Sequence, residues 1–213
     1  MSAAFTTDCR ACPRLSKHLA GVREEYADYH GRPVAPFGAA RPDLLVVGLA
    51  PGMHGANRTG RPFTGDYAGI LLYETLHRYG YANRPVSVAP EDGLKLKRCR
   101  ITNAVKCLPP GNKPETSEVR QCNAYLKAEL EALPGRAAIL ALGAIAHQAV
   151  LMALGLKRNG HPFAHAARHV LPDGKVLFDS YHCSRYNTNT RRLTEAMFRD
   201  VFERIGEHLA NGS

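Results

Sequence analysis

Residues Asp43–Gly48 read DLLVVG and are the clearest indication of the architecture of this chain. An uninterrupted apolar run of this length is typical of a strand that is buried on both faces, as in a parallel sheet covered by helices. Glycine and proline follow within Gly48–Pro51, so the strand ends in a tight loop. We therefore expect this strand to lie at the centre of a sheet.

Three further apolar runs predict strands, and helical patterns separate them. The strands are expected at Arg100–Val105 (RITNAV), Ala137–Leu142 (AAILAL) and Lys175–Asp179 (KVLFD). Apolar residues near a 3.6-residue period predict helices. These helices cover Ala68–Tyr79, Thr116–Leu133, with Ser117 as its N-cap, Ala144–Leu154 and Thr194–Leu209.

The alternation of strands and helices predicts the fold class. It indicates an α/β protein with a central, mostly parallel four-stranded sheet flanked by helices. The 213 residues fit one domain over residues 1–213. Ligands of such sheets bind beyond the carboxyl ends of the strands. The loops after Gly48, around Asn103 and after Asp179 lie at such ends, whereas Ala82–Arg98 is expected to be a surface excursion.

Composition and charge narrow the classes of partner. The chain is 45% hydrophobic and 22% charged, which is ordinary for a globular protein. Its formal net charge of +9 favours a polyanionic partner, most commonly nucleic acid, although a basic enzyme without such a partner remains an alternative. No apolar run is long enough to span a bilayer, and the charged first twenty residues do not form a secretory signal. We expect a cytoplasmic monomer with no membrane partner.

Cysteines in two distant pairs predict a metal centre. Cys9 and Cys12 form Cys-x2-Cys, while Cys107 and Cys122 form Cys-x14-Cys. Four thiolates gathered from distant segments can hold zinc or an iron–sulfur cluster. The alternative is that they are ordinary buried thiols. Six cysteines in a chain expected to be cytosolic favour metal binding over disulfides.

The loop Gly48–Asp66, GLAPGMHGANRTGRPFTGD, is the first candidate binding loop. Its five glycines permit close approach of a ligand to the backbone, and its arginines favour an anion. It lacks the Gly-Lys-Ser/Thr ending of a phosphate-binding P-loop and the spacing of a dinucleotide fold. A long loop of this composition is more often functional than merely structural.

This loop and three other segments resemble the type B, or family 5, uracil-DNA glycosylases of the iron–sulfur superfamily. ITNAVKCLPP at Ile101–Pro110 is similar to the second shared segment, and SYHCSRYNTNT at Ser180–Thr190 to the third. CRACPRL at Cys9–Leu15 is similar to the cluster-binding start. The resemblance implies a monofunctional DNA repair glycosylase of the base excision pathway. It also implies a [4Fe–4S] cluster on the four paired cysteines, with zinc as the second choice, and leaves Cys99 and Cys183 outside.

Four positions depart from the family pattern. Met53 follows Gly52 where small residues are usual, and Cys183 stands where proline or a small apolar residue often follows the histidine. Arg191 replaces a glycine that commonly lies near DNA, and so adds a phosphate contact. Leu49 stands where relatives carry an acidic or amide residue. Leu49 cannot activate water, and it suits a roomier pocket for hypoxanthine or other deaminated bases.

The resemblance and the chemistry of base excision together assign roles. We expect Asp66 to position water and stabilise an oxocarbenium-like state, and His182 to donate to the departing base. Phe63 is expected to stack on the base and Asn103 to read its edge. Asp66 also suits a helix N-cap, and Phe63 also suits the core. The other expected substrate-binding residues are Gly48, Leu49, Ala50, Pro51, His54, Gly55 and Asn57, and the expected DNA contacts are Arg58, Arg61, Ser184, Arg185, Asn187 and Arg191.

The substrate is expected to be single- or double-stranded DNA that contains uracil or another deaminated base. We identify no lysine in the motifs that would form a Schiff base, so we expect the reaction to stop at the abasic site. Two other functions stay open on the residues alone. One is a cluster-bearing nucleic-acid-binding protein without catalysis, and the other is an α/β hydrolase that acts on free nucleotides.

Overall fold

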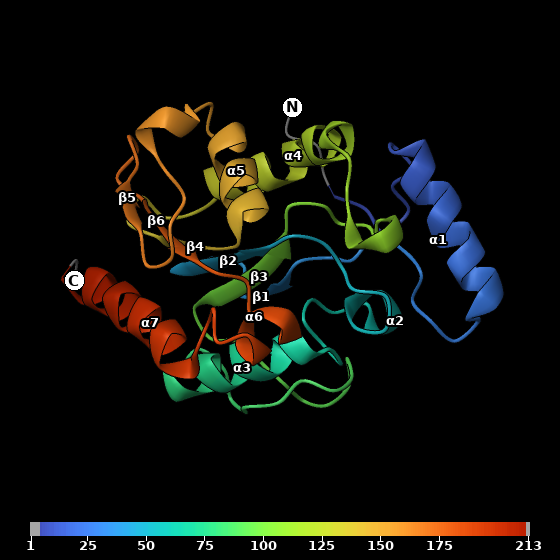
Figure 1. Ribbon diagram of the computed structural model, residues 1–213, viewed down its shortest axis with the longest axis horizontal. Coiled ribbons are helices and arrows are strands. Elements are labelled where there is room, and N and C mark those ends of the chain that lie inside the picture. The colour runs from blue at the N-terminus through green and yellow to red at the C-terminus, as the bar shows by residue number, and fades with distance from the viewer. Residues whose placement is uncertain (1–4, 212–213) are drawn as a thin grey trace.

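Four parallel strands form the centre of the sheet, as the sequence predicts. In the computed structural model, which describes residues 5–211, they are β2 (Leu44–Gly48), β3 (Cys99–Asn103), β4 (Ala138–Leu142) and β6 (Val176–Ser180). Figure 1 shows them side by side at the middle of the molecule. The expected α/β class is therefore confirmed.

Two short antiparallel strands extend the sheet at its edges, so the expected count of four strands was too low. β1 (Phe37–Gly38) pairs with β3, and β5 (Arg168–Val170) pairs with β6. The described part of the chain thus has a six-stranded mixed sheet in the order β1-β3-β2-β4-β6-β5. Strands of two and three residues are too short to show a period-two pattern, which is why the sequence did not reveal them.

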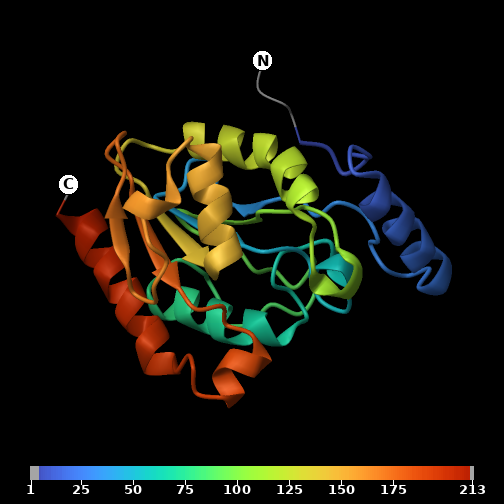
Figure 2. The same cartoon turned by 45° about the horizontal axis from the view of Figure 1, so that its top comes forward.

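The sheet separates two apolar layers. Leu44 and Val46 of β2 point to one side, while Leu45 and Val47 point to the other. Side chains alternate across a strand, so one continuous apolar run supplies both layers. Helices cover both faces (Figure 2). The first side carries α3 (Tyr67–Arg78) and α7 (Glu195–Ala210), and the second carries α4 (Thr116–Glu131) and α5 (Ala144–Ala153).

Helix ends follow ordinary capping chemistry, with one correction. Glu115 is the N-cap of α4 and forms a capping box with Glu118, so Ser117 lies inside the helix and is not its cap. Thr194 caps α7 by accepting a hydrogen bond from the Met197 N–H. The other predicted helix boundaries agree with the structure to within a few residues.

Three further helices and two 3-10 turns complete the described part of the chain. α1 (Pro13–Glu25) lies apart from the sheet in Figure 1 and was not predicted. α2 (Ala56–Thr59) interrupts the first motif, and α6 (Arg185–Asn189) follows His182. Two single 3-10 turns lie at Pro110–Asn112 and Arg158–Gly160.

The order of the strands places the motifs together. β3 and β4 flank β2 on opposite sides, so the chain reverses direction across the sheet at β2. Gly48 pairs with Asn103 and Leu142 pairs with Ser180, so the carboxyl ends share one edge. Such a switch point is where α/β sheets bind ligands.

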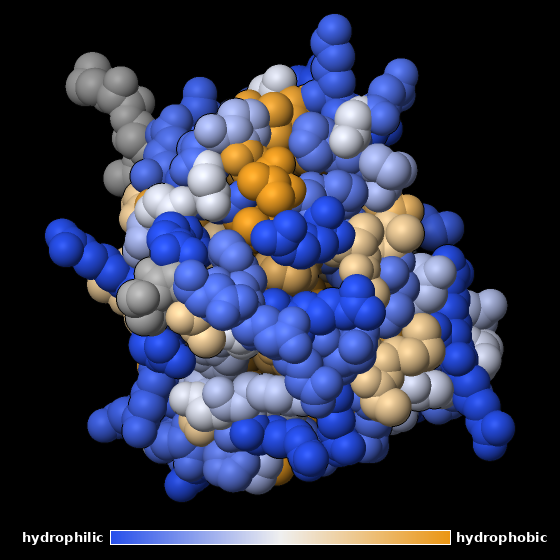
Figure 3. Space-filling view, turned by 90° about the vertical axis from the view of Figure 1, so that its left-hand side faces the viewer, coloured by the Kyte–Doolittle hydropathy of each residue, from blue (hydrophilic) through white to orange (hydrophobic). Residues whose placement is uncertain are grey.

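The face on which β5 and α7 lie is mostly hydrophilic, with a small apolar patch in its upper part (Figure 3). Val170 of β5 is exposed. Within residues 5–211, no helix combines the length and apolar character that crossing a membrane requires.

Candidate active site

Gly48 makes the centre of the site possible. A Cβ atom placed on Gly48 would lie 2.4 Å from the Asn103 Oδ1 atom and 2.7 Å from the Phe63 Cζ atom. Real Cβ atoms do not approach other atoms so closely, so only glycine fits without rearrangement. The end of β2 therefore lets a strand residue and a loop residue meet at the sheet edge.

Phe63 lies both in the core and beside the catalytic candidates. Its side chain is buried among the residues under α3, and its backbone has a left-handed φ of 53°. Its ring centroid lies 6.0 Å from that of His182, with 28° between the ring planes. The buried position agrees with the core interpretation made from the sequence, while stacking on a base stays a prediction. A left-handed non-glycine residue is uncommon and is often found at functional sites.

Asn103 and Asn57 carry the unpartnered polar atoms of the site. Both side chains are buried, and their Oδ1 atoms accept no hydrogen bond from any described residue. The Asn57 Nδ2 atom has a weak contact of 3.9 Å with the Met53 sulfur. A buried amide without a partner is expensive, so these oxygens favour a polar ligand.

Asp66 serves as a helix cap and still has a second oxygen available. Its Oδ1 atom accepts a hydrogen bond of 2.8 Å from the Gly69 N–H at the start of α3. Its Oδ2 atom faces the Gly52–Gly55 turn, where a Cβ on Gly55 would lie 2.5 Å away. Burial raises the pKa of Asp66, and the hydrogen bond from Gly69 opposes that rise.

His182 lies two residues after the end of β6, and a hydrogen bond from a side chain holds its backbone. The Asn187 Nδ2 atom donates a hydrogen bond of 2.8 Å to the His182 carbonyl oxygen. Burial lowers the pKa of the His182 ring to about 4, so the ring is neutral near pH 7. A neutral imidazole still has one N–H to donate. The sequence alone did not settle this charge.

The expected substrate and DNA contacts do not all share one surface. His54 and Arg58 are exposed, and the Tyr29 hydroxyl lies 2.8 Å from the His54 Nδ1 atom. Arg185 is exposed and lies over the Tyr67 ring. The half-buried Ser184 caps α6. Leu49 and Ala50 are half-buried, whereas Pro51 and Gly55 are buried.

Arg61 requires a correction. Its side chain is buried, and its Nη2 atom lies 2.6 Å from the Asp92 Oδ2 atom. Its Nε–H donates to the Thr64 hydroxyl. These contacts use Arg61 to fasten the Ala82–Arg98 excursion to the first loop, so we remove it from the residues that contact DNA.

Three features were missed or only partly read from the sequence. Tyr186 in α6 is 71% exposed, which is unusual for an aromatic residue. Arg191 has a φ of 55°, in the left-handed region that favours glycine. Cys183 is fully buried in the core, which explains why an apolar residue suits its position.

Lys106 also requires a correction, because it does lie within the second motif. Its side chain is buried, and its Nζ atom lies 2.6 Å from the Glu129 Oε1 atom. It donates a further hydrogen bond to the Thr102 hydroxyl. A lysine enclosed in this way does not reach a sugar, so it does not weaken the expectation that no Schiff base forms.

The four paired cysteines lie around one cavity. Cys9, Cys12, Cys107 and Cys122 all line it, although Cys9 and Cys122 are 113 residues apart. The Tyr125 hydroxyl donates a hydrogen bond of 3.3 Å to the Cys9 sulfur. The backbone N–H of Lys106 donates one of the same length to the Cys122 sulfur. Burial and the neighbouring sulfurs raise the pKa of the Cys107 thiol to about 12. Without a cation these crowded groups stay protonated thiols, and a bound metal would hold them as thiolates, so this donor set fits a metal centre.

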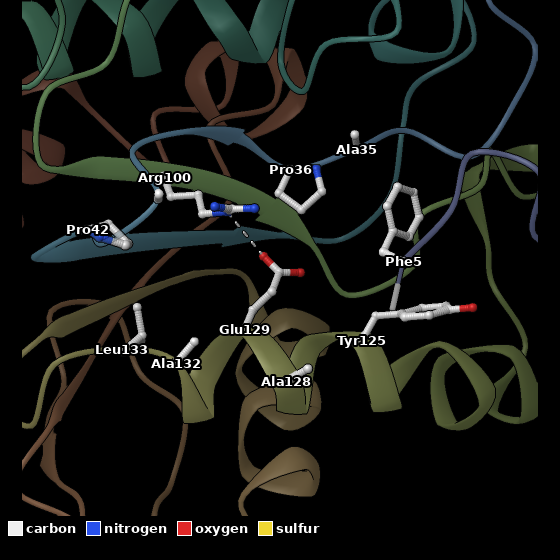
Figure 4. A pocket seen from close by; sticks show the side chains of 11 residues that line it. Phe5, Ala35, Pro36, Pro42, Arg100, Tyr125, Ala128, Glu129, Ala132 and Leu133 are labelled. Atoms are coloured by element: carbon white, nitrogen blue, oxygen red, sulfur yellow. Dashed lines mark ion pairs between the residues drawn. The ribbon is translucent and has the colours of Figure 1, made fainter. Parts of the chain in front are cut away.

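A larger cavity lies elsewhere and does not contain the site. It measures about 450 Å³ and lies between α4 and the Ala35–Pro42 segment. Figure 4 shows the Arg100 and Glu129 side chains facing one another across it, 3.8 Å apart. None of the three motif residues Phe63, Asn103 and His182 lines it.

An amide, an aromatic ring, a carboxylate and a neutral imidazole at one sheet edge suit a hydrolase that acts on a planar base. The sequence model of the Uracil DNA glycosylase superfamily matches residues 35–206. The Type-5 uracil-DNA glycosylase of Thermus thermophilus is 46% identical over 200 residues, which are 92% of this chain and 91% of that protein. The Type-5 protein of Pyrobaculum aerophilum is 43% identical over 201 residues, 92% of this chain and 87% of that protein.

A more distant relative is the Type-4 uracil-DNA glycosylase of Sulfurisphaera tokodaii, 26% identical over 177 residues, 78% of this chain and 71% of that protein. The chain belongs to the uracil DNA glycosylase superfamily, in its type-5 branch. The resemblance found in the four motifs is confirmed.

Proposed function

We propose that this protein hydrolyses the N-glycosidic bond of uracil in DNA and leaves an abasic site. The type-5 relatives carry the name uracil-DNA glycosylase, which supports this activity. The observation that carries the proposal for the site is the buried, unpartnered Oδ1 atom of Asn103 beside Phe63. An amide can both accept from and donate to the edge of uracil.

The base has to leave the DNA helix before it can reach these residues. Flipping costs a few kcal/mol and gives access to the anomeric carbon. We place the flipped uracil against Phe63, with its polar edge on Asn103. Tyr186 is exposed on α6, which begins three residues after His182, and we propose it as the residue that fills the space that the base leaves in the stack.

Asp66 and His182 divide the chemistry. The bond between C1′ and the base nitrogen breaks, its electron pair leaves with the base, and the oxygen of water bonds to C1′. Asp66 Oδ2 is free to orient that water and accept its proton, while its charge stabilises the cationic sugar. The neutral His182 ring donates a hydrogen bond to O2 of the departing anion.

We propose that the cysteine cavity holds a [4Fe–4S] cluster. A tetrahedral zinc site with Zn–S bonds of about 2.3 Å brings its sulfurs to roughly 3.8 Å from one another. Among the histidine, cysteine, aspartate and glutamate residues described, only His147, His169 and Asp179 have three ligand atoms within 4.8 Å of one another. No three of the cysteine sulfurs are therefore that close to one another. Wider spacing favours the larger cluster. It would tie the N-terminal segment to the chain after Asn103.

Several finer expectations accompany this proposal. Arg58, Ser184, Arg185 and Arg191 are proposed to contact the DNA backbone. The half-buried Leu49 offers no polar group, so hypoxanthine and other deaminated bases are further proposed substrates. A cytoplasmic location and a monomeric state stay predictions.

Excision of uracil from labelled oligonucleotides tests the proposal. Purified protein is incubated with uracil-containing single- and double-stranded DNA, and abasic sites are then cleaved with alkali. We expect cleavage at uracil and none in matched thymine-containing strands. No cleavage of any deaminated base would contradict the proposal. Iron and acid-labile sulfide in the same preparation, with the brown colour of a cluster, test the cofactor, and one zinc per chain would contradict it.

A further inference from the structure

Asp179, three residues before His182 in the chain, lies inside a buried group of histidines. The Asp179 side chain is fully buried in β6. The Nδ1 atom of His147, from α5, lies 2.8 Å from its Oδ1 atom. The Nε2 atom of His169, from β5, lies 3.2 Å from its Oδ2 atom. The group therefore joins one helix and two strands beneath the catalytic candidate.

The hydrogen-bond partners of the two His147 ring nitrogens indicate which of these nitrogens carry a proton. Its Nε2 atom lies 2.9 Å from the His161 carbonyl oxygen, and its Nδ1 atom faces the Asp179 carboxylate. The carbonyl oxygen is an acceptor, and so are both oxygens of Asp179 when that carboxyl group is ionised. A neutral imidazole has a single N–H, so one nitrogen lone pair would point at an oxygen over a hydrogen-bond distance. A second proton on the ring removes that conflict.

Asp179 is arranged to keep its negative charge opposite that ring. Each carboxylate oxygen faces a histidine nitrogen, and hydrogen bonds to the charged form stabilise it. A metal ion between the same atoms is the alternative, because a metal-binding histidine also donates its other N–H to a carbonyl. The 2.8 Å separation of His147 Nδ1 and Asp179 Oδ1 is a hydrogen-bond length, and it favours the proton.

The same helix turn supports the backbone under His182. Gly143, four residues before His147, precedes the first residue of α5, and its N–H donates to the Ser180 carbonyl over 2.8 Å. A Cβ on Gly143 would lie 3.6 Å from the His182 Cβ atom. α5 thus contacts the β6 end at two points, one through the Gly143 backbone and the other through the His147 ring.

We propose that His147 is a doubly protonated positioning residue, paired with Asp179, that fixes α5 against the end of β6 and so holds His182 in place. This inference rests on the proposed glycosylase function only in assigning His182 its role. The ion pair and its effect on the His182 ring stand independently of activity.

Two substitutions of His147 separate its contacts. In His147→Asn the amide nitrogen takes the place of Nδ1 and still donates to Asp179, whereas in His147→Gln it takes the place of Nε2 and reaches only the His161 carbonyl. Asp179→Asn keeps both contacts of the carboxylate while allowing a neutral His147, because its amide donates to Nδ1 and its oxygen accepts from His169. His77→Gln, on the exposed side of α3, is the control.

Nitrogen NMR of protein labelled in histidine, together with single-turnover uracil excision, tests the proposal. We expect both ring nitrogens of native His147 to be protonated, and only Nε2 in Asp179→Asn. The His182 ring signals should move in His147→Gln and stay in place in His77→Gln. Excision should slow by roughly 10- to 100-fold in His147→Gln, the effect of a misplaced catalytic group. Affinity for abasic DNA should be retained, and Asp179→Asn should stay close to wild type.

Three results would overturn it. The ion pair would be contradicted if only one ring nitrogen of native His147 carried a proton. It would also be contradicted if the native protein held one equivalent of a metal other than iron and His147→Asn lost that metal. A native excision rate in His147→Gln would contradict the positioning role. Failure of the proposed function gives a different pattern. Native protein would then not excise uracil, while the His147 and His182 signals would still behave as predicted.

Discussion

Two buried polar groups lie at the carboxyl edge of the same sheet, and they differ in how their hydrogen bonds are satisfied. Around Gly48, the Oδ1 atoms of Asn103 and Asn57 have no partner among the described residues. Around Asp179, both carboxylate oxygens and both nitrogens of His147 face a partner. The first group is incomplete without a ligand, and the second is complete within the fold.

The difference separates a binding role from a supporting one. An unsatisfied buried polar atom costs about 1–3 kcal/mol, which a matching ligand recovers. A satisfied buried group fixes the elements that carry it. We therefore propose that Asn103 recognises the base and that Asp179 supports the His182 segment, so substitutions in the two groups should have opposite consequences.

Replacing Asp66 should have the largest effect. Asp66→Asn keeps an oxygen for the Gly69 N–H but loses the charge, so single-turnover excision should fall by about 10²- to 10⁴-fold, the usual contribution of a general base. Asp66→Ala should lose the same activity and also about 0.5–2 kcal/mol of stability, because the cap disappears. Excision rates and thermal unfolding measure the two effects. An Asp66→Asn variant with the native rate would remove Asp66 from the chemistry.

Truncation in the two groups should separate stability from activity. Asp179→Ala leaves the buried His147 ring without its counterion and should lower the free energy of unfolding by about 3–5 kcal/mol. Asn103→Ala removes an unpartnered amide, so its stability should stay within about 1 kcal/mol of wild type, while excision falls by less than in Asp66→Asn. Urea unfolding and excision assays check both. Strong destabilisation by Asn103→Ala would show that the amide is structural.

Gly48→Ala should close the base site while leaving the sheet formed. The new methyl would meet Asn103 Oδ1 at 2.4 Å and Phe63 Cζ at 2.7 Å. Displacing these groups by about 1 Å should cost roughly 100-fold in excision. The measurement is single-turnover excision beside a circular dichroism spectrum. Gly135→Ala, whose nearest neighbour to a new Cβ is 4.0 Å away, is the matched control.

The pH dependence should identify the group that limits the rate in acid. Asp66 must be ionised to accept a proton, and its pKa is raised by burial, so activity should fall as pH drops through a value above that of an ordinary aspartate. The decrease should be about tenfold per pH unit below that point. His182 has a pKa of about 4 and is neutral near pH 7, so its own titration lies at the acid end of the profile. A rate profile that keeps its acid limb in Asp66→Asn would point to another group.

Arg191→Gly should have the smallest effect. Glycine relieves the left-handed backbone at φ 55° and should stabilise the protein by about 1 kcal/mol. Loss of the exposed charge should weaken binding to DNA modestly and reduce the dependence of binding on salt. Thermal unfolding and salt titrations of DNA affinity check the two parts. Unchanged affinity would place Arg191 outside the DNA interface.

The fold was largely readable because its centre depends on continuous apolar runs. DLLVVG and AAILAL supply side chains to both helical layers, and that pattern has few other solutions. β1 and β5 were not readable, because pairing of two or three residues depends on neighbours in space. Ser117 was misplaced as a cap because Glu115 forms a capping box with Glu118.

The motifs predict the residues of the candidate site but not the surroundings of those residues. The motifs predict roles for Asp66, Asn103 and His182. Nothing in the sequence separates Arg58, which is exposed, from Arg61, which is buried against Asp92. That difference arises from the Ala82–Arg98 excursion folding back onto the first loop. The His147–Asp179 pair joins residues 32 positions apart and has no local signature.

A crystal structure of Asp66→Asn with uracil-containing DNA tests the central claim most directly, since the variant should bind the substrate and cleave it slowly. We predict an extrahelical uracil on the Phe63 ring, with its polar edge hydrogen-bonded to Asn103 and its O2 atom accepting from His182, while the His147–Asp179 contact is unchanged. An extrahelical base bound elsewhere, with the Asn103 oxygen still unpartnered, would contradict the account.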